Sequence, residues 1–294
     1  MKKVAIIGLS GDSLFYEVAH LPKLGETVCA SSLHREVGGK GFNQAITLAR
    51  QGIKVNYLTS LGNDEIKTSC ERVLKEEGIN ALIKEKNIES ACASIIKTKD
   101  GKNEIAVFMG ANNLLDLNDL KDFTSYIRES DAILITYEIP YEIVKKAVEI
   151  AKENNLFILI NPAPYTYDDL ELLKDADIVC PNETELMAMM KTDTIDDMKV
   201  LDFIKAVGIK KLVLTMGADG VCIYDKNVTK IPAPKVKAVD TTGAGDVFNA
   251  SMLTYLLLGK NIYEACEFGV GQASASVCTK FVLDAIPRGD KNEK

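Results

Sequence analysis

The sequence predicts an α/β fold in which a doubly wound, mostly parallel sheet is flanked by helices and a small β lid lies outside it. Short apolar runs alternate with helical stretches along most of the chain. These runs are continuously apolar, which is typical of strands buried on both faces of a parallel sheet. Two regions, 12–36 and 91–109, interrupt the alternation with extended sequence and predict the lid.

The elements of the main sheet begin with the first apolar run, VAIIG at 4–8, which predicts a buried strand. Glycines at 52 and 78 mark the ends of the first two helices. The same patterns predict helices at 41–52, 64–78, 141–155, 244–258 and 262–279, and strands at 54–62, 132–136, 156–160, 178–180 and 211–217. In the lid, Asp100-Gly101 predicts the turn of a β-hairpin over 91–109.

The domain organisation that follows is one α/β core carrying an inserted lid. We assign 1–11, 37–90 and 110–294 to the core, and 12–36 and 91–109 to the lid. The sequence contains no internal repeat, low-complexity linker or clear second domain. The tail, RGDKNEK, is charged, and we expect it to be frayed.

Composition excludes several classes of function. The net charge of −7 argues against a broad nucleic-acid surface or a polybasic membrane face. No apolar segment is long enough to span a bilayer, and the apolar run of the N-terminal stretch breaks at Gly8, so we expect no signal peptide. Seven scattered cysteines without a CxxC pair indicate reduced thiols in a cytoplasmic protein. With only two histidines, a histidine metal site or a Ser-His-Asp triad is poorly supplied.

Common cofactor and nucleophile motifs are absent. The first strand is followed by GLSGDS, which lacks the spacing of a dinucleotide fingerprint. Each Gly-Lys pair is followed by glycine or asparagine, so no P-loop is present, and no GxSxG elbow occurs. Oxidative or acyl chemistry on this sheet is therefore disfavoured.

Two glycine clusters remain, VGGKGFNQA at 37–45 and DTTGAGDVFNA at 240–250, and both open apolar helices. Glycines let backbone N–H groups approach a ligand, and the helix dipole favours an anion. Asp246 beside an anion site makes sense as a base that takes a proton from an attacking hydroxyl. Gly243, Ala244 and Gly245 would then stabilise the charge of a transferring phosphoryl group. The alternative is a capped helix that binds nothing.

These two clusters resemble the two signatures of the ribokinase-like (phosphofructokinase-B) family of carbohydrate kinases. The resemblance extends along nearly the whole chain through further motifs in the family's order: GETV (25–28), GANN (110–113), NPAP (161–164), PNETE (181–185) and TMGADG (215–220). It implies transfer of the γ-phosphate of MgATP to a primary alcohol of a sugar or sugar-like molecule. In that role Asp246 is the general base, and Gly243, Ala244 and Gly245 form the anion hole.

The resemblance also implies which residues bind the nucleotide and the acceptor. Asn182, Thr215 and Gly217 match the ATP side, and Glu185 matches a residue that orders Mg²⁺ and its waters. Asn182 is equally a helix N-cap before ETELMAMM. Gly39, Lys40, Asn43 and Glu138 match the acceptor side, and the lid would exclude water from the reaction.

Two departures from the family pattern bear on substrate and ions. The Asn-x-Asp that grips ribose in ribokinases is replaced by Gly11 and Ser13, with Asp12 between them as the substitute that we expect to contact the acceptor. This leaves space that a larger acceptor, such as a nucleoside, could use. Asp240 and Thr242 match one side of a monovalent-cation site. Phe281 and Val282 replace the Gly-Ala of its other side, which counts against K⁺ activation.

The readings that stay open are a kinase for ribose or another sugar, a nucleoside kinase of the same fold, and a non-catalytic sugar- or nucleotide-binding protein. The complete GAGD turn with Asp246 argues against the last, because a sensor needs no base. The expected partner is a small-molecule acceptor. A strand-built lid also has exposed edges, so a homodimer through the lids is expected.

Overall fold

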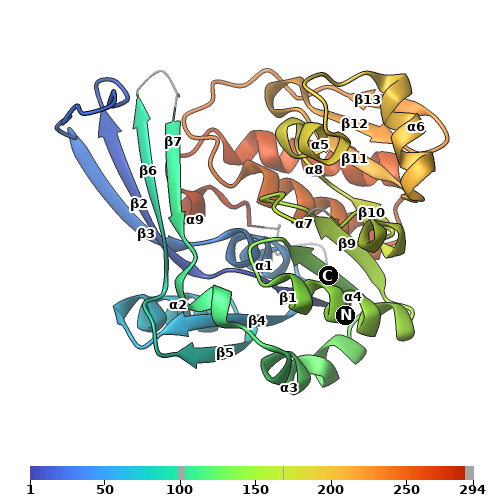
Figure 1. Cartoon of the computed structure of the whole chain (residues 1–294), viewed down its shortest axis with the longest axis horizontal. Coiled ribbons are helices and arrows are strands. Elements are labelled where there is room, and N and C mark those ends of the chain that lie inside the picture. Colours follow the sequence, from blue (N-terminus) through green and yellow to red (C-terminus); the bar gives the residue numbers. More distant parts are fainter. Residues whose placement is uncertain (99–102, 168, 289–294) are drawn as a thin grey trace.

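The computed structural model describes residues 1–98, 103–167 and 169–288. Over these residues, nine strands form one large sheet and four form a smaller one (Figure 1). The predicted Asp100-Gly101 turn and the tail at 289–294 lie outside the described residues. The α/β fold with a small separate sheet is confirmed.

The large sheet has the strand order β13-β12-β11-β10-β9-β8-β1-β4-β5. From β5 to β11 in this order every neighbouring pair is parallel, and β12 and β13 extend the edge as antiparallel strands. The strands are β1 (Lys3–Ile7), β4 (Lys54–Gly62), β5 (Asn80–Lys86), β8 (Ala132–Thr136), β9 (Phe157–Asn161), β10 (Ile178–Val179), β11 (Leu212–Thr215), β12 (Val221–Tyr224) and β13 (Val228–Ile231).

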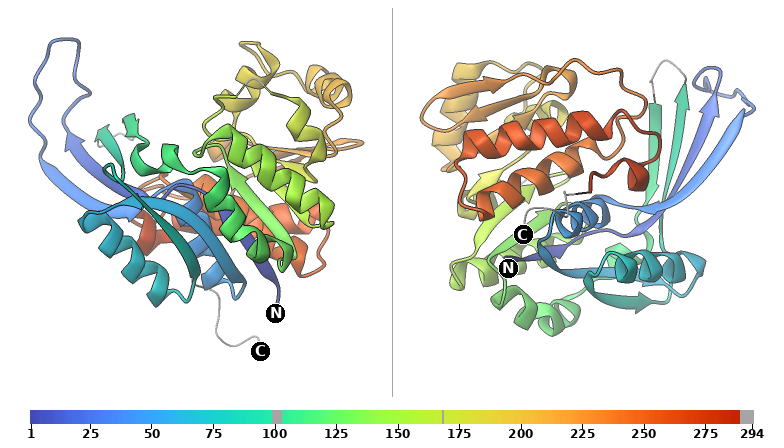
Figure 2. Two further views of the ribbon diagram at one scale, coloured as in Figure 1. Left: turned by 60° about the horizontal axis from the view of Figure 1, so that its bottom comes forward. Right: turned by 180° about the vertical axis from the view of Figure 1, so that it is seen from behind.

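Helices cover both faces of this sheet because successive strand side chains point to opposite sides. In β1, Val4 and Ile6 belong to one buried core, and Ala5 and Ile7 belong to the other. The first core includes α1 (Lys40–Arg50), α2 (Glu65–Glu76), α7 (Ala244–Leu257), α8 (Ile262–Ser276) and α9 (Val282–Ala285). The second includes α3 (Leu117–Arg128), α4 (Tyr141–Glu153), α5 (Glu183–Met190) and α6 (Asp197–Val207). Figure 2 shows α7 and α8 side by side over one face.

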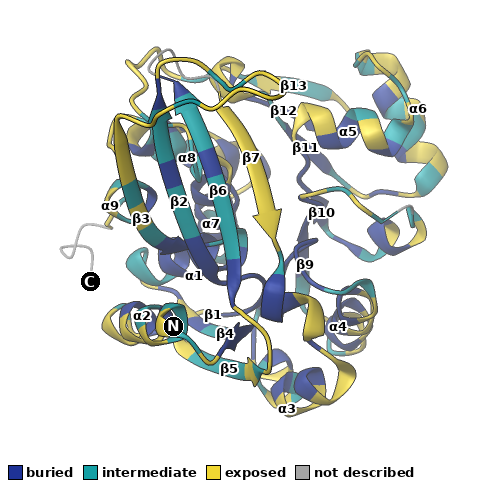
Figure 3. Cartoon of the chain, turned by 60° about the vertical axis from the view of Figure 1, so that its left-hand side comes forward, coloured by how far each residue is buried: buried dark blue, intermediate teal, exposed yellow. Residues whose placement is uncertain are grey.

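The smaller sheet is built from the two regions that interrupt the strand–helix alternation. Its order is β3-β2-β6-β7, with β2 (Gly11–Val18), β3 (Ser32–Gly38), β6 (Ala91–Thr98) and β7 (Asn103–Phe108). Only the central β2–β6 pair is parallel. The sheet stands away from the large one, and its edge strand β7 is exposed along its whole length (Figures 1 and 3). We call this four-stranded sheet the lid.

The helix starts differ in a way that matters for function. Asp64, Asp116, Asn182 and Asn261 cap α2, α3, α5 and α8 with side-chain oxygens. The helices α1 and α7 begin instead on Gly39 and Gly243, which have no side chain to cap them. At the start of α1 the backbone N–H of Lys40 already donates to Glu138 and that of Phe42 to the carbonyl of Leu9, so the opening of α7, rather than that of α1, is the candidate anion site.

Two predictions from composition also have a structural counterpart. Across the described part of the chain, no helix is both long enough and apolar enough to cross a membrane. All seven cysteines are free thiols; four of them (Cys70, Cys180, Cys222 and Cys266) are buried, whereas Cys29 and Cys278 are exposed.

Candidate active site

A cleft of about 810 Å³ lies where strands β9 and β11 of the large sheet end and α5 and α7 begin. Carboxyl ends of parallel strands meet at one edge of such a sheet, which is where α/β proteins bind ligands. Most of the predicted site residues line this cleft: Lys40, Asn182, Glu185, Thr215, Gly217, Gly243, Ala244, Gly245 and Asp246.

Asp246 lies in the first turn of α7 and is 6% exposed. Both of its carboxylate oxygens accept amide hydrogen bonds from α1: Asn43 Nδ2 donates to Oδ2 at 3.0 Å and Gln44 Nε2 donates to Oδ1 at 3.1 Å. Burial raises the pKa of Asp246, and the charge of Lys40 and these two hydrogen bonds offset part of the rise. The side chain is thus a fixed carboxylate with an elevated pKa, which suits a proton acceptor.

The turn before Asp246 requires glycine at its first position. Gly243 has φ of 76°, in the left-handed region, and a Cβ there would lie 2.7 Å from Cγ1 of Val282. The turn therefore brings main-chain N–H groups to the cleft at the positive end of the α7 dipole. This geometry can hold an anion directly beside the Asp246 carboxylate.

Lys40 is the cation at the centre of a group of three buried acids. Burial lowers the pKa of Lys40, but Asp246, Glu138 and Glu185 outweigh it, so the net pKa is raised and the ammonium stays charged. Glu138 Oε2 accepts the backbone N–H of Lys40 at 3.0 Å, which fixes the GGKG turn to the end of β8. The pKa of Glu138 is raised to about 7, chiefly by burial. The charge of Lys40 opposes this rise, and the charge of Asp246 adds to it. Gly39, the N-cap of α1 in this turn, has φ of 119°.

On the opposite side of the cleft, Asn182 and Glu185 form a capping box at the start of α5. Glu185 accepts both the backbone N–H of Asn182, at 2.8 Å, and its side-chain amide, at 2.9 Å. Asn182 pairs with Thr215 as an isolated parallel bridge, and Thr215 donates its N–H to Pro181. Gly217 follows with φ of 54° and nothing within 4 Å of its Cβ position, so the cleft is open at this turn.

Asp12 was expected to contact the acceptor, but its side chain does not join the group around Asp246 and Lys40. Strand alternation turns Asp12 to the other face of β2, where Oδ2 accepts Nε of Arg35 at 2.6 Å. Ser13 faces the site instead: a Cβ on Gly38 would lie 3.2 Å from Ser13 Oγ and 3.7 Å from Asn43 Oδ1. Among the described residues this buried Asn43 oxygen has no hydrogen-bond partner.

The space expected at Gly11 is also absent. A Cβ on Gly11 would lie 2.4 Å from the carbonyl oxygen of Ala91, its parallel neighbour in β6. The backbone of β6 therefore fills the place that a longer side chain would take. The argument that Gly11 makes room for a larger acceptor is wrong.

Asp240 and Thr242 lie in the segment that leads into the glycine turn. Thr242 donates its N–H and its hydroxyl to Oδ1 of Asp240, at 3.1 and 2.7 Å. The other oxygen, Oδ2, accepts Nζ of Lys97 from the lid at 2.5 Å.

Comparison with known proteins agrees with this geometry. A profile of the pfkB family of carbohydrate kinases matches residues 1–287. The chain belongs to the pfkB family. It is 33% identical to the ribokinase of Haemophilus influenzae over 97% of this chain and 95% of the relative. Two solved structures are similar over 98% of the chain: Giardia lamblia ribokinase (26% identity, TM-score 0.91, 98% of that chain) and Arabidopsis thaliana ribokinase complexed with ribose and ATP (26%, 0.84, 96%).

As a pfkB carbohydrate kinase, the protein is a phosphotransferase that acts on an alcohol group. Sequence reasoning missed two side chains of this kinase, Gln44, which donates to Asp246, and Lys97, which donates to Asp240; it named Ser13 only as a departure from the family pattern. Gln44 had a signal, because it directly follows Asn43 in the GGKGFNQA cluster and is a second amide near the start of the helix. Lys97 had none, because its partner Asp240 lies 143 residues away.

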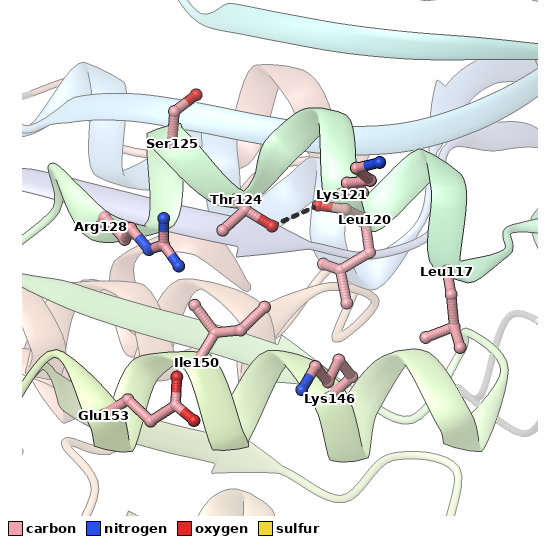
Figure 4. Close-up of a pocket in the computed structure, with 9 residues that line it drawn as sticks. All are labelled: Leu117, Leu120, Lys121, Thr124, Ser125, Arg128, Lys146, Ile150 and Glu153. Carbon is pink, nitrogen blue, oxygen red and sulfur yellow. Dashed lines mark hydrogen bonds between the residues drawn. The ribbon is translucent and has the colours of Figure 1, made fainter.

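The pfkB kinase has a second hollow, of about 520 Å³, between α3 and α4 (Figure 4). Leucine and isoleucine side chains line its base, and Lys121, Arg128, Lys146 and Glu153 lie at its edge. It shares no lining residue with the first cleft and contains none of the predicted site residues.

Proposed function

We propose that this pfkB kinase transfers the γ-phosphate of ATP to a primary hydroxyl of a free sugar, with a pentose such as ribose as the first candidate. The observation that carries the proposal is the buried Asp246 carboxylate, held through both oxygens at the opening of α7. The ribokinases among its relatives support ribose as the first acceptor to test.

The acceptor lies between the lid and α1. Its reacting hydroxyl donates to Asp246, and a neighbouring hydroxyl donates to the unpartnered Oδ1 of Asn43. Ser13 and the backbone at Gly39 contact the rest of the sugar, and Glu138 holds the GGKG turn in place through the N–H of Lys40. Ser13 thus replaces Asp12 as the proposed contact of the acceptor.

Phosphoryl transfer then needs a base and compensation of charge. Asp246 takes the proton from the sugar hydroxyl as the hydroxyl oxygen attacks the γ-phosphorus, and the bond from the γ-phosphorus to the β–γ bridging oxygen breaks to release ADP. The raised pKa of the buried carboxylate favours the proton transfer. The N–H groups of the turn at Gly243, Ala244 and Gly245 stabilise the charge that develops on the phosphoryl oxygens. Lys40, which stays protonated, adds a positive charge across the cleft.

The nucleotide lies along the part of the cleft lined by Asn182, Thr215 and Gly217. Glu185, buried in the same cleft, fits a site for Mg²⁺ because it shares the charge of Lys40 with Asp246 and Glu138, and carboxylate oxygens suit this ion. Glu185 would hold Mg²⁺ through waters, and the ion, when bound, neutralises phosphate charge. The cytoplasmic location expected from the sequence stays a prediction.

The lid edge supports a homodimer. All residues of β7 are exposed, and Ile105, Val107 and Phe108 are each about half exposed. An unpaired strand edge with apolar side chains favours pairing with a second copy. Light scattering of the wild type and of Ile105→Glu tests this: we expect a dimer that the glutamate dissociates, and a monomeric wild type contradicts the proposal.

An acceptor screen tests the proposed reaction. ADP formation is measured with ribose, 2-deoxyribose, fructose and a set of nucleosides, at fixed MgATP. We expect turnover with a free pentose and little with nucleosides. Turnover confined to nucleosides would favour the nucleoside kinase, and tight ligand binding without turnover on any acceptor would favour the non-catalytic binder.

A further inference from the structure

Asp240 anchors the segment that forms the start of the phosphoryl-transfer turn. Its side chain is 7% exposed, and Oδ1 accepts both the N–H and the hydroxyl of Thr242, immediately before Gly243. An acid that is this little exposed and accepts two hydrogen bonds on one oxygen needs a cation beside the other oxygen.

The lid supplies that cation. Lys97 of β6 reaches across from the lid and places Nζ 2.5 Å from Oδ2 of Asp240. Its side chain is only 17% exposed, and the ammonium also lies 5.1 Å from the ring centroid of Phe15, on the neighbouring strand β2. An ammonium held by a carboxylate on one side and an aromatic face on the other is fixed in position.

On the other wall of the expected monovalent-cation site, the Glu36 carboxylate is already bonded to backbone N–H groups. Val282 and Leu283 present backbone N–H groups, which donate to the carboxylate of Glu36 at 3.0 and 3.3 Å. The ring of Phe281 stacks on His34 with 3.4 Å between centroids. The side chain of Val282 closes the space next to Gly243. A potassium ion is bound by several oxygen atoms, whereas here the carboxylate oxygens of Asp240 and Glu36 already accept hydrogen bonds from Lys97, Thr242 and the two backbone N–H groups.

We infer that the ammonium of Lys97 replaces the monovalent cation in this chain, so that the kinase needs no potassium and its anion turn is held in place by the lid. Lys97 acts on the reaction through Asp240 and is a positioning residue. The inference rests on the proposed kinase function. It also means that the charge balance at Asp240, just before the Gly243-Ala244-Gly245 turn, depends on the position of β6, because Lys97 belongs to that lid strand.

Cation substitution tests the inference on the wild-type enzyme. ADP formation is measured in KCl, NaCl and choline chloride at equal ionic strength, and thermal unfolding is followed in the same three salts. We expect kcat to agree within about twofold and the melting temperature to agree within about 1 °C. A stimulation of fivefold or more by potassium over choline overturns the inference, as does a melting temperature raised by potassium alone.

Three variants test the role of the side chain. Lys97→Met should lower kcat about tenfold or more while the KM for ATP changes little, and Lys97→Arg should retain most of the activity because it keeps the charge. The matched control is Lys86→Met, which removes an equally shielded ion pair, Lys86 with Asp119 at 2.6 Å, far from the cleft. Equal kcat in Lys97→Met and Lys86→Met overturns the inference.

The two levels of proposal fail in different ways. Absence of turnover in every salt and with every acceptor contradicts the proposed kinase reaction. Turnover that requires potassium contradicts only the replacement by Lys97. If Lys97→Met does not fold, the cation response of the wild type still decides the question.

Discussion

The side-chain amide of Gln44 donates to Oδ1 of Asp246 at 3.1 Å, joining residues 202 positions apart. Together with Asn43 on the other oxygen, it orients the carboxylate in a nearly water-free position. Hydrogen bonds to the ionised form lower a carboxyl pKa, whereas burial raises it. Gln44 therefore limits how far the pKa of the proposed base rises.

Replacing Gln44 should move the acid limb of the pH profile. In Gln44→Leu the loss of one hydrogen bond to the charged form raises the pKa of Asp246, so the base stays protonated to higher pH. A hydrogen bond to a charged group contributes about 1.5–3 kcal/mol, so we expect a shift of about one unit or more towards alkaline pH. The measurement is kcat from pH 5 to 9.

Gln51 provides the matched control for this experiment. It lies at the other end of α1 and donates to Ser251 Oγ of α7 at 2.7 Å, away from Asp246. Gln51→Leu should reduce stability without moving the pH profile. Identical profiles for the two leucine variants would contradict the role given to Gln44.

The base itself gives the simplest activity prediction. Asp246→Asn should retain binding of ATP and acceptor but lower kcat by roughly two to four orders of magnitude, the usual contribution of a general base. Titration calorimetry with ATP and steady-state ADP release measure the two effects. An exposed carboxylate remote from the cleft, changed in Asp202→Asn, serves as control. Near-normal kcat in Asp246→Asn refutes the assignment.

Contact between the glycine turn and Val282 predicts a coupled effect on stability. Gly243→Ala should cost about 1–3 kcal/mol of unfolding free energy, because φ is left-handed and the new Cβ meets Val282 Cγ1. In Gly243→Ala/Val282→Ala the clash is gone, so the double loss should be smaller than the sum of the two single losses by about 1 kcal/mol. Denaturant titration of all four proteins measures this coupling, and strict additivity contradicts it.

Ser13 and Asp12 are neighbours on the lid strand β2, but we expect them to have different roles. Ser13→Ala should raise the acceptor KM about 3- to 10-fold, the effect of one lost hydrogen bond, with little change in the KM for ATP. Asp12→Asn should lower the melting temperature by a few degrees and leave both KM values alone, because Asp12 is paired with Arg35 on the other face. A raised acceptor KM in Asp12→Asn alone restores the role predicted from the sequence.

The raised pKa of Glu138 predicts how stability depends on pH. The folded protein holds this proton up to about pH 7, whereas the ordinary value is 4.5, so the native state binds more protons between these limits. Its contribution to stability is complete below about pH 4.5 and is lost as pH rises through 7. Glu138→Gln should remove about 3 kcal/mol of this pH dependence. Urea unfolding at pH 5, 6, 7 and 8 checks it, and parallel curves for the two proteins contradict it.

Sequence reasoning worked well for the elements whose pattern is strong. The strands at 54–62 and 132–136 are found with those bounds: 132–136 is a nearly continuous apolar run, and 54–62 is a short stretch of strand-forming residues that follows Gly52 and ends at Gly62. It missed β5 and α3, whose residues are half exposed or largely polar and lack such runs. The last strands, β12 and β13, are short and antiparallel, so the parallel pattern gave no reason to expect them.

Within the site, local motifs predicted what is encoded locally. The glycine turns and the capping box at Asn182 follow from short sequence patterns. The two faces of a strand were harder: ungapped comparison aligns Ser13 with the family's aspartate, and Asp12 was predicted as the substitute that contacts the acceptor, whereas the alternation of side chains along β2 turns Ser13, not Asp12, to the site. Pairings between distant residues, such as Lys97 with Asp240, depend on how the lid is seated and have no local signal.

The pairing of α1 with α7 has a consequence for how the protein is made. Asn43 and Gln44 are buried polar side chains whose partner Asp246 is synthesised about 200 residues later. At roughly 5–20 residues per second, a ribosome takes roughly 10–40 s to deliver it. During that interval the nascent chain carries two amides without their carboxylate partner. Glu36 of β3 likewise lacks the N–H groups of Val282 and Leu283, which are synthesised later still. The proposed catalytic group of Asn43, Gln44 and Asp246 is therefore among the last parts of the protein to be completed during translation.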